Sequence, residues 1–315
     1  MVKLIEAELN EFERALAGEL ESPVAFIRAI GEDLVAAGGK RLRPSLSFLA
    51  GKLIGANHQD AMRVALAVEL LHSASLLHDD LIDDARMRRG HEAAFRRYGN
   101  VVSVMSGDFM LAKVLHLLSL TNHADFTMLM SETATQICEG EVLQFEVASL
   151  GSYSLANYFK IIEGKTAVLL VAALEGVAML SGACEAQRQA LRQYGLSYGR
   201  AFQMQDDYLD LLGDPQKLGK PVGGDLKEGK ATYPILLLFE RGVEEARSLL
   251  ARRCEREGDV ARMIDLVREH GADLAASAYI AKTAQKAIVA LSVFSDSPSK
   301  QALQTLARRE IKRSL

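Results

Sequence analysis

Proline is scarce in this chain, and the strict alternation of polar and apolar residues that marks β-strands is almost absent. Six of the 315 residues are proline, and long stretches repeat their apolar residues with the period of an amphipathic helix. Together these features predict an all-α protein. Because no linker, low-complexity tract or break in composition interrupts the chain, we expect a single domain over residues 1–315.

Cysteine and unbalanced charge are scarce as well. The three cysteines, Cys138, Cys184 and Cys254, are odd in number and far apart. That spacing argues against a disulfide framework or a zinc site, and it predicts reduced, buried thiols in a cytoplasmic protein. The formal net charge of −4 gives no reason to expect a nucleic-acid partner.

Signals for export or membrane insertion are also missing. The first residues carry acid at Glu6 and Glu8, where a signal peptide would be apolar. The longest apolar run, 167–182, contains Glu175 and is short for a membrane span. We therefore expect no export signal and no membrane span, and we interpret this run as a buried core helix.

The apolar periodicity predicts helices over most of the chain. They are expected at 3–18, 23–36, 45–55, 59–77, 101–120, 127–147, 158–182 and 187–212, with further amphipathic helices after 235. Residues 95–100 are expected to form a polar connection. Residues 213–234 are the longest irregular segment, and loops of such length are often lids or binding loops.

A cluster of four aspartates follows the apolar helix that precedes residue 79. Asp79 and Asp83 are four residues apart, so on a helix both carboxylates leave the same face. Asp80 and Asp84 form a second pair beside them. Hard oxygen ligands suit Mg²⁺, which keeps several waters and commonly shares its carboxylates with the phosphate groups of a substrate.

A second cluster repeats this pattern more than a hundred residues later. Asp206 and Asp210 are again one helical turn apart, with Asp207 alongside. If the two helices face each other, their carboxylates frame one anionic cavity that can hold several divalent ions.

Two short basic stretches could hold phosphate groups. Residues 38–44 read Gly-Gly-Lys-Arg-Leu-Arg-Pro, and the glycines let the backbone approach an anion closely. Lys40 offers a mobile point charge and Arg43 a planar fork for phosphate oxygens, although an exposed basic loop fits the pattern equally well. Arg88 and Arg89 follow the first acidic cluster.

Lys165 and Thr166 stand at the start of the longest apolar run. A lysine and a hydroxyl at the boundary of a buried helix could hold an anion, and a snorkelling lysine is the alternative. Glu141 and Gln144 share one helix face, where a role inside the cavity and a solvated surface are both open.

Other polar residues have less specific surroundings. His72 lies about two turns before Asp79 and could lean into the same cavity, while His78 could support the acids or be structural. A lone helical histidine more often has a structural role. Lys220 and Lys230 lie in the long irregular segment and could close over anions.

Carboxylate clusters, cations and an apolar helical interior suit an apolar substrate with a polyanionic head, as in a prenyl diphosphate. The ordered motifs are GGKRLRP at 38–44, LLHDDLIDD at 76–84, RRG at 88–90, GEVLQ at 140–144, KT at 165–166, FQMQDDYLD at 202–210 and GKPVGGDLKEGKATYP at 219–234. In this set and order the chain resembles the trans-isoprenyl diphosphate synthases, or polyprenyl synthetases. It departs from them at Arg86-Met87, where relatives frequently carry an acidic residue.

The resemblance implies an isoprenoid-synthase-type helical bundle around a central cavity, a homodimer, and about three Mg²⁺ ions. By motif match, the metals would be held by Asp79, Asp83 and Asp206, with support from Asp80, Asp207 and Asp210. The allylic prenyl diphosphate would contact Arg88, Lys165, Thr166, Gln203 and Lys220. Isopentenyl diphosphate would contact Lys40, Arg43, His72 and Arg89. The leaving diphosphate itself would accept the proton, so no protein base is required.

The same resemblance bears on product length, because the growing tail would pass the first acidic helix. Ser75 and Ala74 precede Asp79 by four and five residues, which is roughly 6–7.5 Å deeper by helical rise. Both are too small to form a floor, so we expect an octaprenyl-type product, a quinone side-chain precursor that could partition into a membrane. A deeper floor could come from Leu129, Met130 or Phe126.

Four other functions remain open from the sequence. A geranylgeranyl or farnesyl diphosphate synthase is disfavoured by small residues at 74 and 75. A terpene cyclase normally mixes Asn, Ser and Glu in its second metal motif, and a head-to-head synthase more often carries a membrane anchor. A non-catalytic subunit of a heteromeric synthase would not need both acidic motifs intact.

Overall fold

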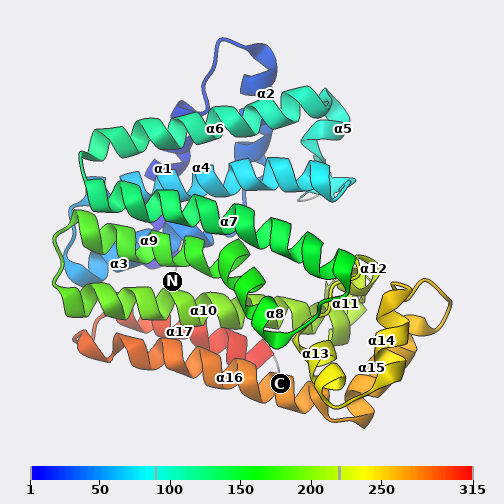
Figure 1. The fold of residues 1–315 in the computed structure, drawn as a ribbon. Helices are drawn as coiled ribbons and strands as arrows, with labels where there is room; N and C mark the ends of the chain where they lie inside the picture. The colour runs from blue at the N-terminus through cyan, green and yellow to red at the C-terminus, as the bar shows by residue number, and fades with distance from the viewer. Residues whose placement is uncertain (1, 89–90, 219–220, 314–315) are drawn as a thin grey trace. The chain divides into compact units, whose positions relative to one another are not determined.

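The computed structural model describes residues 2–88, 91–218 and 221–313, and helices dominate it (Figure 1). The predicted all-α class is confirmed, with one small addition. Strands β1 (Met87–Arg88) and β2 (His91–Glu92) pair antiparallel, with Met87 opposite Glu92 and Arg88 opposite His91. Two residues are too few to show a period in the sequence, which is why this hairpin was not predicted.

The helices define the order of the chain. In sequence they are η1 (Val2–Leu4), α1 (Glu6–Glu19), α2 (Ala25–Ala36), α3 (Leu42–Ile54), α4 (His58–Ile82), α5 (Ala94–Tyr98), α6 (Asn100–Thr121), α7 (Ala124–Leu150), α8 (Leu155–Ile162), the π-helical turn η2 (Glu163–Ala167), α9 (Val168–Leu180), α10 (Glu185–Leu212), α11 (Pro215–Leu218), α12 (Gly224–Lys227), α13 (Tyr233–Glu240), α14 (Glu244–Ala251), α15 (Asp259–Glu269), α16 (Ala272–Ala290), η3 (Leu291–Val293) and α17 (Pro298–Arg313).

The chain forms two compact units. Unit 1 consists of Met1–Ala134, Leu169–Arg192 and Val293–Leu303, and unit 2 consists of Thr135–Val168, Gln193–Ser292 and Gln304–Leu315. Unit 1 therefore contains the first acidic motif and unit 2 contains the second. The prediction of one domain over residues 1–315 stays a prediction.

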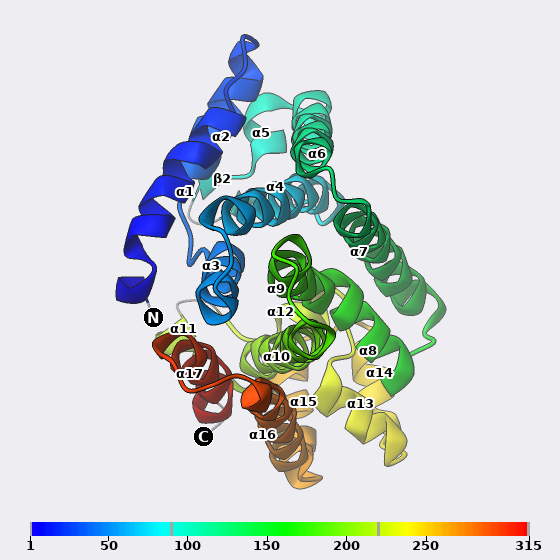
Figure 2. The same cartoon turned by 90° about the vertical axis from the view of Figure 1, so that its left-hand side faces the viewer.

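Helix α4 is the central element of unit 1. It packs along α6 and against α3, and Figures 1 and 2 show α4 and α6 lying side by side. The helix begins with an N-cap at Asn57, whose side chain accepts a hydrogen bond from the backbone N–H of Gln59 at 2.9 Å. Its middle, from Val64 to Leu71, is buried. Burial of this middle section holds α4 in place and so determines where the aspartates at its C-terminal end lie.

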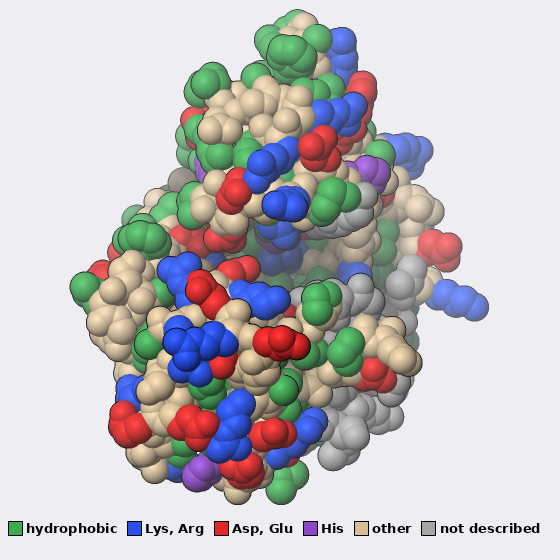
Figure 3. Space-filling view, turned by 90° about the vertical axis from the view of Figure 1, so that its right-hand side faces the viewer, with side chains coloured by type: hydrophobic (Ala, Val, Ile, Leu, Met, Phe, Trp, Pro, Cys, Tyr) green, Lys and Arg blue, Asp and Glu red, His purple; other side chains and the backbone are tan. Residues whose placement is uncertain are grey.

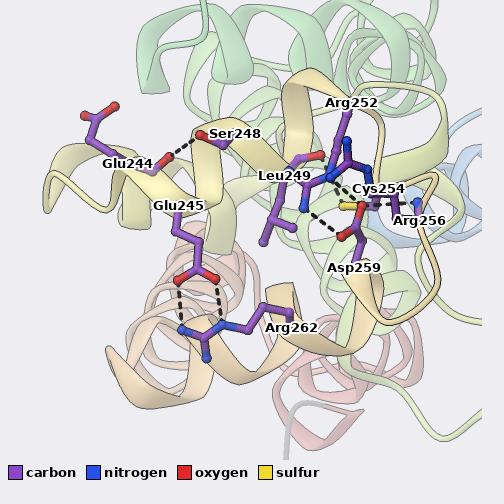
Figure 4. Close-up of polar contacts among 9 residues, drawn as sticks. All are labelled: Glu244, Glu245, Ser248, Leu249, Arg252, Cys254, Arg256, Asp259 and Arg262. Atoms are coloured by element: carbon purple, nitrogen blue, oxygen red, sulfur yellow. Dashed lines mark hydrogen bonds and ion pairs between the residues drawn. The ribbon is translucent and has the colours of Figure 1, made fainter.

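Unit 2 has its own apolar core, which contains a cluster of aromatic rings. Tyr233 stacks on Tyr279 with ring centroids 5.1 Å apart, and Tyr158 lies 6.1 Å from Tyr233. At one edge of this unit, α14 and α15 are tied together by two-pronged ion pairs (Figure 4). Arg252 contacts Asp259 at 2.8 Å through two nitrogens, so the connection between the two helices is held from both ends,.

Several predicted boundaries are wrong in detail. Residues 95–100 were expected to be a connection, but α5 occupies Ala94–Tyr98. The expected single helix over 158–182 is α8, a π-turn and α9, and the segment 213–234 contains the one-turn helices α11 and α12. An element of a single turn is too short to repeat its apolar residues, so the hydrophobic pattern of the sequence does not predict it.

The cysteines are free, as predicted, but two of them are not buried. Cys138 and Cys184 are exposed, while Cys254 is buried. Lone cysteines usually behave as small apolar residues, and that general tendency failed here for Cys138 on α7 and for Cys184, which precedes α10. On the face drawn in Figure 3, the described Lys and Arg side chains are interspersed with Asp and Glu.

The run at 167–182 was interpreted as a buried core helix, and α9 is indeed buried from Leu169 to Ala178. Among the described residues, helix α6 is long and apolar enough to cross a membrane by length and composition. In this structure 39% of its most apolar window is buried, and the helix packs along α4. A core helix meets the same criteria, so this property alone does not assign α6 to a membrane. Its exposed apolar residues include Val101, Met105, Leu115 and Leu120.

Candidate functional site

The first acidic motif lies at the end of α4, as predicted. The backbone N–H of Asp83 donates to the carbonyl of Asp79 at 2.8 Å, so the two residues are one helical turn apart and their side chains leave the same face. Asp79 is half-buried and Asp83 is exposed. The helix extends to Ile82, five residues beyond its predicted end at 77, which places Asp79 and Asp80 inside the helix.

The other two aspartates of this motif pair with arginines. Asp80 is buried, and its Oδ1 accepts a hydrogen bond from Nε of Arg88 at 2.7 Å. Asp84 pairs with Arg96 at 2.5 Å. Both arginines follow the aspartates closely in sequence, Arg88 in β1 and Arg96 in α5. Asp80 and Asp84, at this end of α4, are therefore neutralised at least in part by arginines of the protein itself,.

The predicted isopentenyl diphosphate ligands that can be placed all belong to unit 1. Lys40 is exposed, and Arg43 and His72 are half-buried. Arg89 lies outside the described residues. The ring of His78, which the sequence left open, packs against Gly107, and its Nε2 lies 3.2 Å from the carbonyl of Val104 and 3.5 Å from the carboxylate of Asp108.

The residues predicted to control product length differ in exposure. Ala74 is fully buried, whereas Ser75 is half-buried and its hydroxyl donates to the carbonyl of His72 at 2.9 Å. Ser75 is therefore the position where a larger side chain disturbs the packing of α4 less. The floor candidates Phe126, Leu129 and Met130 are all buried.

Lys165 and Thr166 lie in a π-helical turn, η2, and such turns are frequent at functional sites. A Cβ added at Gly164 would lie 2.6 Å from the carbonyl oxygen of Gln136, so α7 approaches this turn too closely for any other residue. Nζ of Lys165 contacts the carboxylate of Glu141 at 2.7 Å and donates to Oε1 of Gln144 at 3.1 Å. Glu141 and Gln144 therefore both bind this lysine, and Gln144 also lines the cavity described below.

A chain of hydrogen bonds connects this turn to the second acidic motif. The hydroxyl of Thr166 donates to Oε1 of Gln203 at 2.7 Å, and Nε2 of Gln203 donates to Oδ1 of Asp207 at 2.9 Å. The hydroxyl of Tyr158 donates to the other oxygen of Asp207 at 2.7 Å. Both oxygens of this buried carboxylate are therefore bound by neutral donors.

A further aspartate, Asp225, lies beside this motif and was not predicted. Its backbone N–H donates to Oδ2 of Asp210 at 3.0 Å, and the backbone N–H of Gly223 donates to the carbonyl of Asp210 at 2.7 Å. Burial, with repulsion from Asp207 and Asp210, raises the pKa of Asp225 to about 7. Burial also raises the pKa of Asp207 to about 6, against the opposing effect of its bonds to Tyr158 and Gln203.

These side chains surround a cavity of about 140 Å³ inside unit 2. Its polar wall contains Lys165, Gln203, Asp207, Asp225 and Lys230. Four of these five residues were predicted as functional from the sequence. Lys220 lies outside the described residues, and Asp206 is half-buried on the same helix as Asp207.

Two signals could have identified the residues that the sequence analysis missed. Tyr158 precedes Lys165 by seven residues, which is two helical turns on one face. Asp225 follows two glycines within the long irregular segment that carries Lys230.

Comparison with known proteins identifies the family. A family model described as Polyprenyl synthetase matches residues 24–269. The chain belongs to the polyprenyl synthetase family. It is 35% identical over 315 residues to the octaprenyl diphosphate synthase of Haemophilus influenzae, a match that covers 99% of this chain and 96% of that protein. The predicted resemblance and the prenyltransferase activity of a trans-polyprenyl diphosphate synthase are confirmed.

Two further relatives extend this comparison. A solved polyprenyl synthase from Caulobacter crescentus, complexed with calcium and isoprenyl diphosphate, superposes with a TM-score of 0.90 at 39% identity, covering 100% of this chain and 96% of that one. A short chain isoprenyl diphosphate synthase from Methanothermobacter thermautotrophicus is 34% identical over 293 residues, covering 91% of this chain and 90% of that protein. The isoprenoid-synthase all-α fold is thus confirmed, while relatives of this polyprenyl synthetase differ in product length.

Polyprenyl synthetases use divalent metal ions, and the donor set of this chain fits such ions. Among the residues that the structure describes, no three His, Cys, Asp or Glu side chains lie close enough to hold a metal together. Mg²⁺ does not require such a cage, since it commonly takes one or two carboxylates, several waters and substrate phosphates. Pairs of carboxylates one turn apart, at Asp79 with Asp83 and at Asp206 with Asp210, match that requirement.

Proposed function

We propose that this polyprenyl synthetase condenses isopentenyl diphosphate head-to-tail with an allylic prenyl diphosphate to make a medium- or long-chain all-trans product of octaprenyl type. The observation that supports this most directly is the cavity of unit 2, in which Lys165, Gln203, Asp207 and Lys230 gather around one polar wall. Cations beside carboxylates suit a metal-bound diphosphate. The reaction would supply the side chain of a quinone.

The residues have separate roles in this proposal. Asp79, Asp83 and Asp206 would hold Mg²⁺, about three ions in all, which supplies positive charge to the departing diphosphate. Lys165 and Thr166, with Gln203, would orient the allylic diphosphate, and Arg88, Lys220 and Lys230 would add cationic contacts. Lys40, Arg43, His72 and Arg89 would bind isopentenyl diphosphate. The released diphosphate accepts the proton after carbon–carbon bond formation, and apolar surroundings keep water from the allylic cation.

Product length is the finer part of the proposal. Small side chains at Ala74 and Ser75 leave no floor one turn below Asp79, and the Haemophilus relative is an octaprenyl diphosphate synthase. A second candidate is a short-chain product, favoured by the similarity to the short chain synthase of Methanothermobacter. A non-catalytic subunit is disfavoured, because the network from Thr166 through Gln203 to Asp207 is complete.

One assay tests both the reaction and the product length. The purified protein is incubated with radiolabelled isopentenyl diphosphate, an allylic primer and Mg²⁺, and the dephosphorylated products are separated by chromatography. We expect an octaprenyl product. Products of farnesyl or geranylgeranyl length would instead establish the short-chain alternative.

Two substitutions test, in the same assay, whether the growing prenyl tail passes Ala74 and Ser75. Ala74→Phe and Ser75→Phe are each expected to shorten the product, because an aromatic ring would form a floor beside the growing chain. Ser75→Phe is the cleaner variant, since Ala74 is fully buried. Unchanged product length in both variants, with turnover retained, would show that the tail does not pass this face of α4.

Homodimer formation and a cytoplasmic location belong to the proposal as well. Exposed apolar residues on α6, Val101, Met105, Leu115 and Leu120, are compatible with a second copy of the chain. Light scattering on the purified protein gives the mass directly, and a monomeric mass at working concentration would reject the homodimer.

A further inference from the structure

Arg41, the second cation of the segment 38–44, points into unit 1 and not toward solvent. It is 6% exposed. Its Nε and Nη2 donate to the two oxygens of Glu13 on α1 at 2.6 and 2.9 Å, and its Nη1 donates to Glu69 on α4 at 2.9 Å. Glu69 is itself buried. One guanidinium thus joins the start of α3 to two other helices.

The charge of this arginine is secure despite its burial. Burial alone would lower the pKa of the Arg41 guanidinium, but the bonds and charges of Glu13 and Glu69 outweigh burial and raise it. The ring of Phe12 lies 6.0 Å from the guanidinium carbon. A buried, fully charged fork with a fixed partner on each side has little freedom to move.

The backbone at Arg41 is unusual for a residue with a side chain. Its φ and ψ are 43° and 44°, in the left-handed region, which residues other than glycine seldom adopt. Gly38 and Gly39 before it also have positive φ, at 57° and 151°. Such strain persists only where the surroundings impose it, and it occurs often at binding sites. Here the surroundings are the ion pairs to α1 and α4.

The strained turn determines where its neighbours lie. The carbonyl of Arg41 accepts the hydrogen bond from the N–H of Ser45 at 2.9 Å that opens α3. Lys40, one residue earlier, is exposed, and Arg43, two residues later, is half-buried. The three basic residues of one short segment are therefore divided into a buried anchor and two cations that remain accessible.

We propose that Arg41 is a positioning residue for isopentenyl diphosphate binding, because its ion pairs with Glu13 and Glu69 hold the left-handed turn that presents Lys40 and Arg43. This inference rests on the proposed function of those two cations. Arg41 does not contact the substrate. Its effect is therefore confined to the site that Lys40 and Arg43 form, and it leaves the contacts that Lys165, Thr166 and Gln203 would make with the allylic diphosphate unchanged.

The test uses Arg41→Lys and Glu69→Gln in the full chain, with Glu13→Gln as a milder variant in case either fails to fold. We expect the KM for isopentenyl diphosphate and its Kd, measured by calorimetry, to rise about tenfold, since small displacements of binding groups have effects of that size or larger. The KM for the allylic primer is expected to stay within about twofold of wild type.

Glu175→Gln is the matched control. Glu175 is a fully buried carboxylate of unit 1 that pairs with Arg192 at 3.2 Å and Arg188 at 3.5 Å. Its loss should lower the melting temperature as the Arg41 and Glu69 variants do, without raising the KM for isopentenyl diphosphate.

Each outcome decides the inference. A selective rise in KM and Kd for isopentenyl diphosphate, absent in Glu175→Gln, supports it. An equal change for both substrates, or a lower melting temperature with unchanged Kd, would show that Arg41 is merely structural. If wild-type protein neither binds isopentenyl diphosphate nor extends a primer, the proposed function fails and takes this inference with it. If wild-type protein is active and the variants bind normally, only the role of Arg41 is rejected.

Discussion

The two acidic motifs have the same spacing of aspartates but different supporting residues. At the end of α4, Asp80 pairs with Arg88 and Asp84 with Arg96. On α10, Asp207 is bound by the neutral donors Tyr158 and Gln203. The first motif is thus partly neutralised by arginine, whereas burial raises the pKa values of Asp207 and of the neighbouring Asp225 at the second. One sequence pattern therefore supports two different electrostatic environments.

The largest effect should come from removing one metal-binding carboxylate in each motif. Asp79→Asn and Asp206→Asn are each expected to lower kcat by about 10³-fold, since metal ions supply several kcal/mol of charge stabilisation. Steady-state kinetics and circular dichroism would show lost turnover with folding intact. Near-normal rates in either variant would remove that aspartate from the metal site.

A smaller effect should follow from crowding the π-turn beside the second motif. In Gly164→Ala the new Cβ would lie 2.6 Å from the carbonyl oxygen of Gln136, so the turn must shift and carry Lys165 and Thr166 with it. We expect a loss of about tenfold in kcat/KM for the allylic primer. The control is Gly18→Ala, where nothing lies within 4 Å of the new Cβ, and activity there should be unchanged. Equal activity in the two variants would contradict the proposed role of the π-turn.

A few-fold effect is expected when the second motif loses one neutral donor. Tyr158→Phe removes the bond to Asp207, and the Mg²⁺ concentration for half-maximal activity should change while the apolar packing of the ring is kept. Tyr98→Phe serves as the control, because Tyr98 also donates to an aspartate, Asp33 at 2.9 Å, outside both motifs. A matching change in the Tyr98 variant would mean that the effect is general destabilisation.

The smallest effect concerns the dependence of stability on pH. The pKa values of Asp207 and Asp225 are raised from 3.8 to about 6 and about 7, so the folded protein binds protons that the unfolded chain releases. Their contribution to the free energy of unfolding is therefore present below about pH 4 and is lost as the pH rises toward 7. Mg²⁺ should raise the melting temperature more at about pH 8 than at about pH 5.

The Asp225→Asn variant checks this assignment by differential scanning calorimetry. It should show a weaker loss of stability with rising pH in the absence of Mg²⁺. A pH profile identical to wild type would show that other groups cause the dependence.

The sequence predicted the helical class and the shared helix faces of the aspartate pairs because both depend on local spacing. Aspartates four residues apart share a helix face wherever the helix lies, so Asp79 with Asp83 and Asp206 with Asp210 could be assigned at once. The helical period also located α4, α6 and α10 to within a few residues. Motif order then supplied the family.

The remaining features depend on contacts between segments distant in sequence. Arg41 looked like its neighbours Lys40 and Arg43, and only the positions of Glu13 and Glu69 on other helices separate it from them. The π-turn at Lys165 lies against α7 at Gly164, and no local pattern reports that close approach. Likewise, the pairing of Asp80 with Arg88 and of Asp84 with Arg96 leaves no periodic signal in the sequence.

The exposure of two cysteines provides a practical route for following this enzyme in solution. Cys184 belongs to unit 1 and Cys138 to unit 2, so a thiol-reactive probe pair would place one reporter in each without any engineered residue. Cys254 would stay unlabelled, because burial raises the pKa of its thiol to about 11 and only the thiolate reacts. Fluorescence transfer between the two labels, recorded as substrates are added, would report changes in the distance between them during turnover.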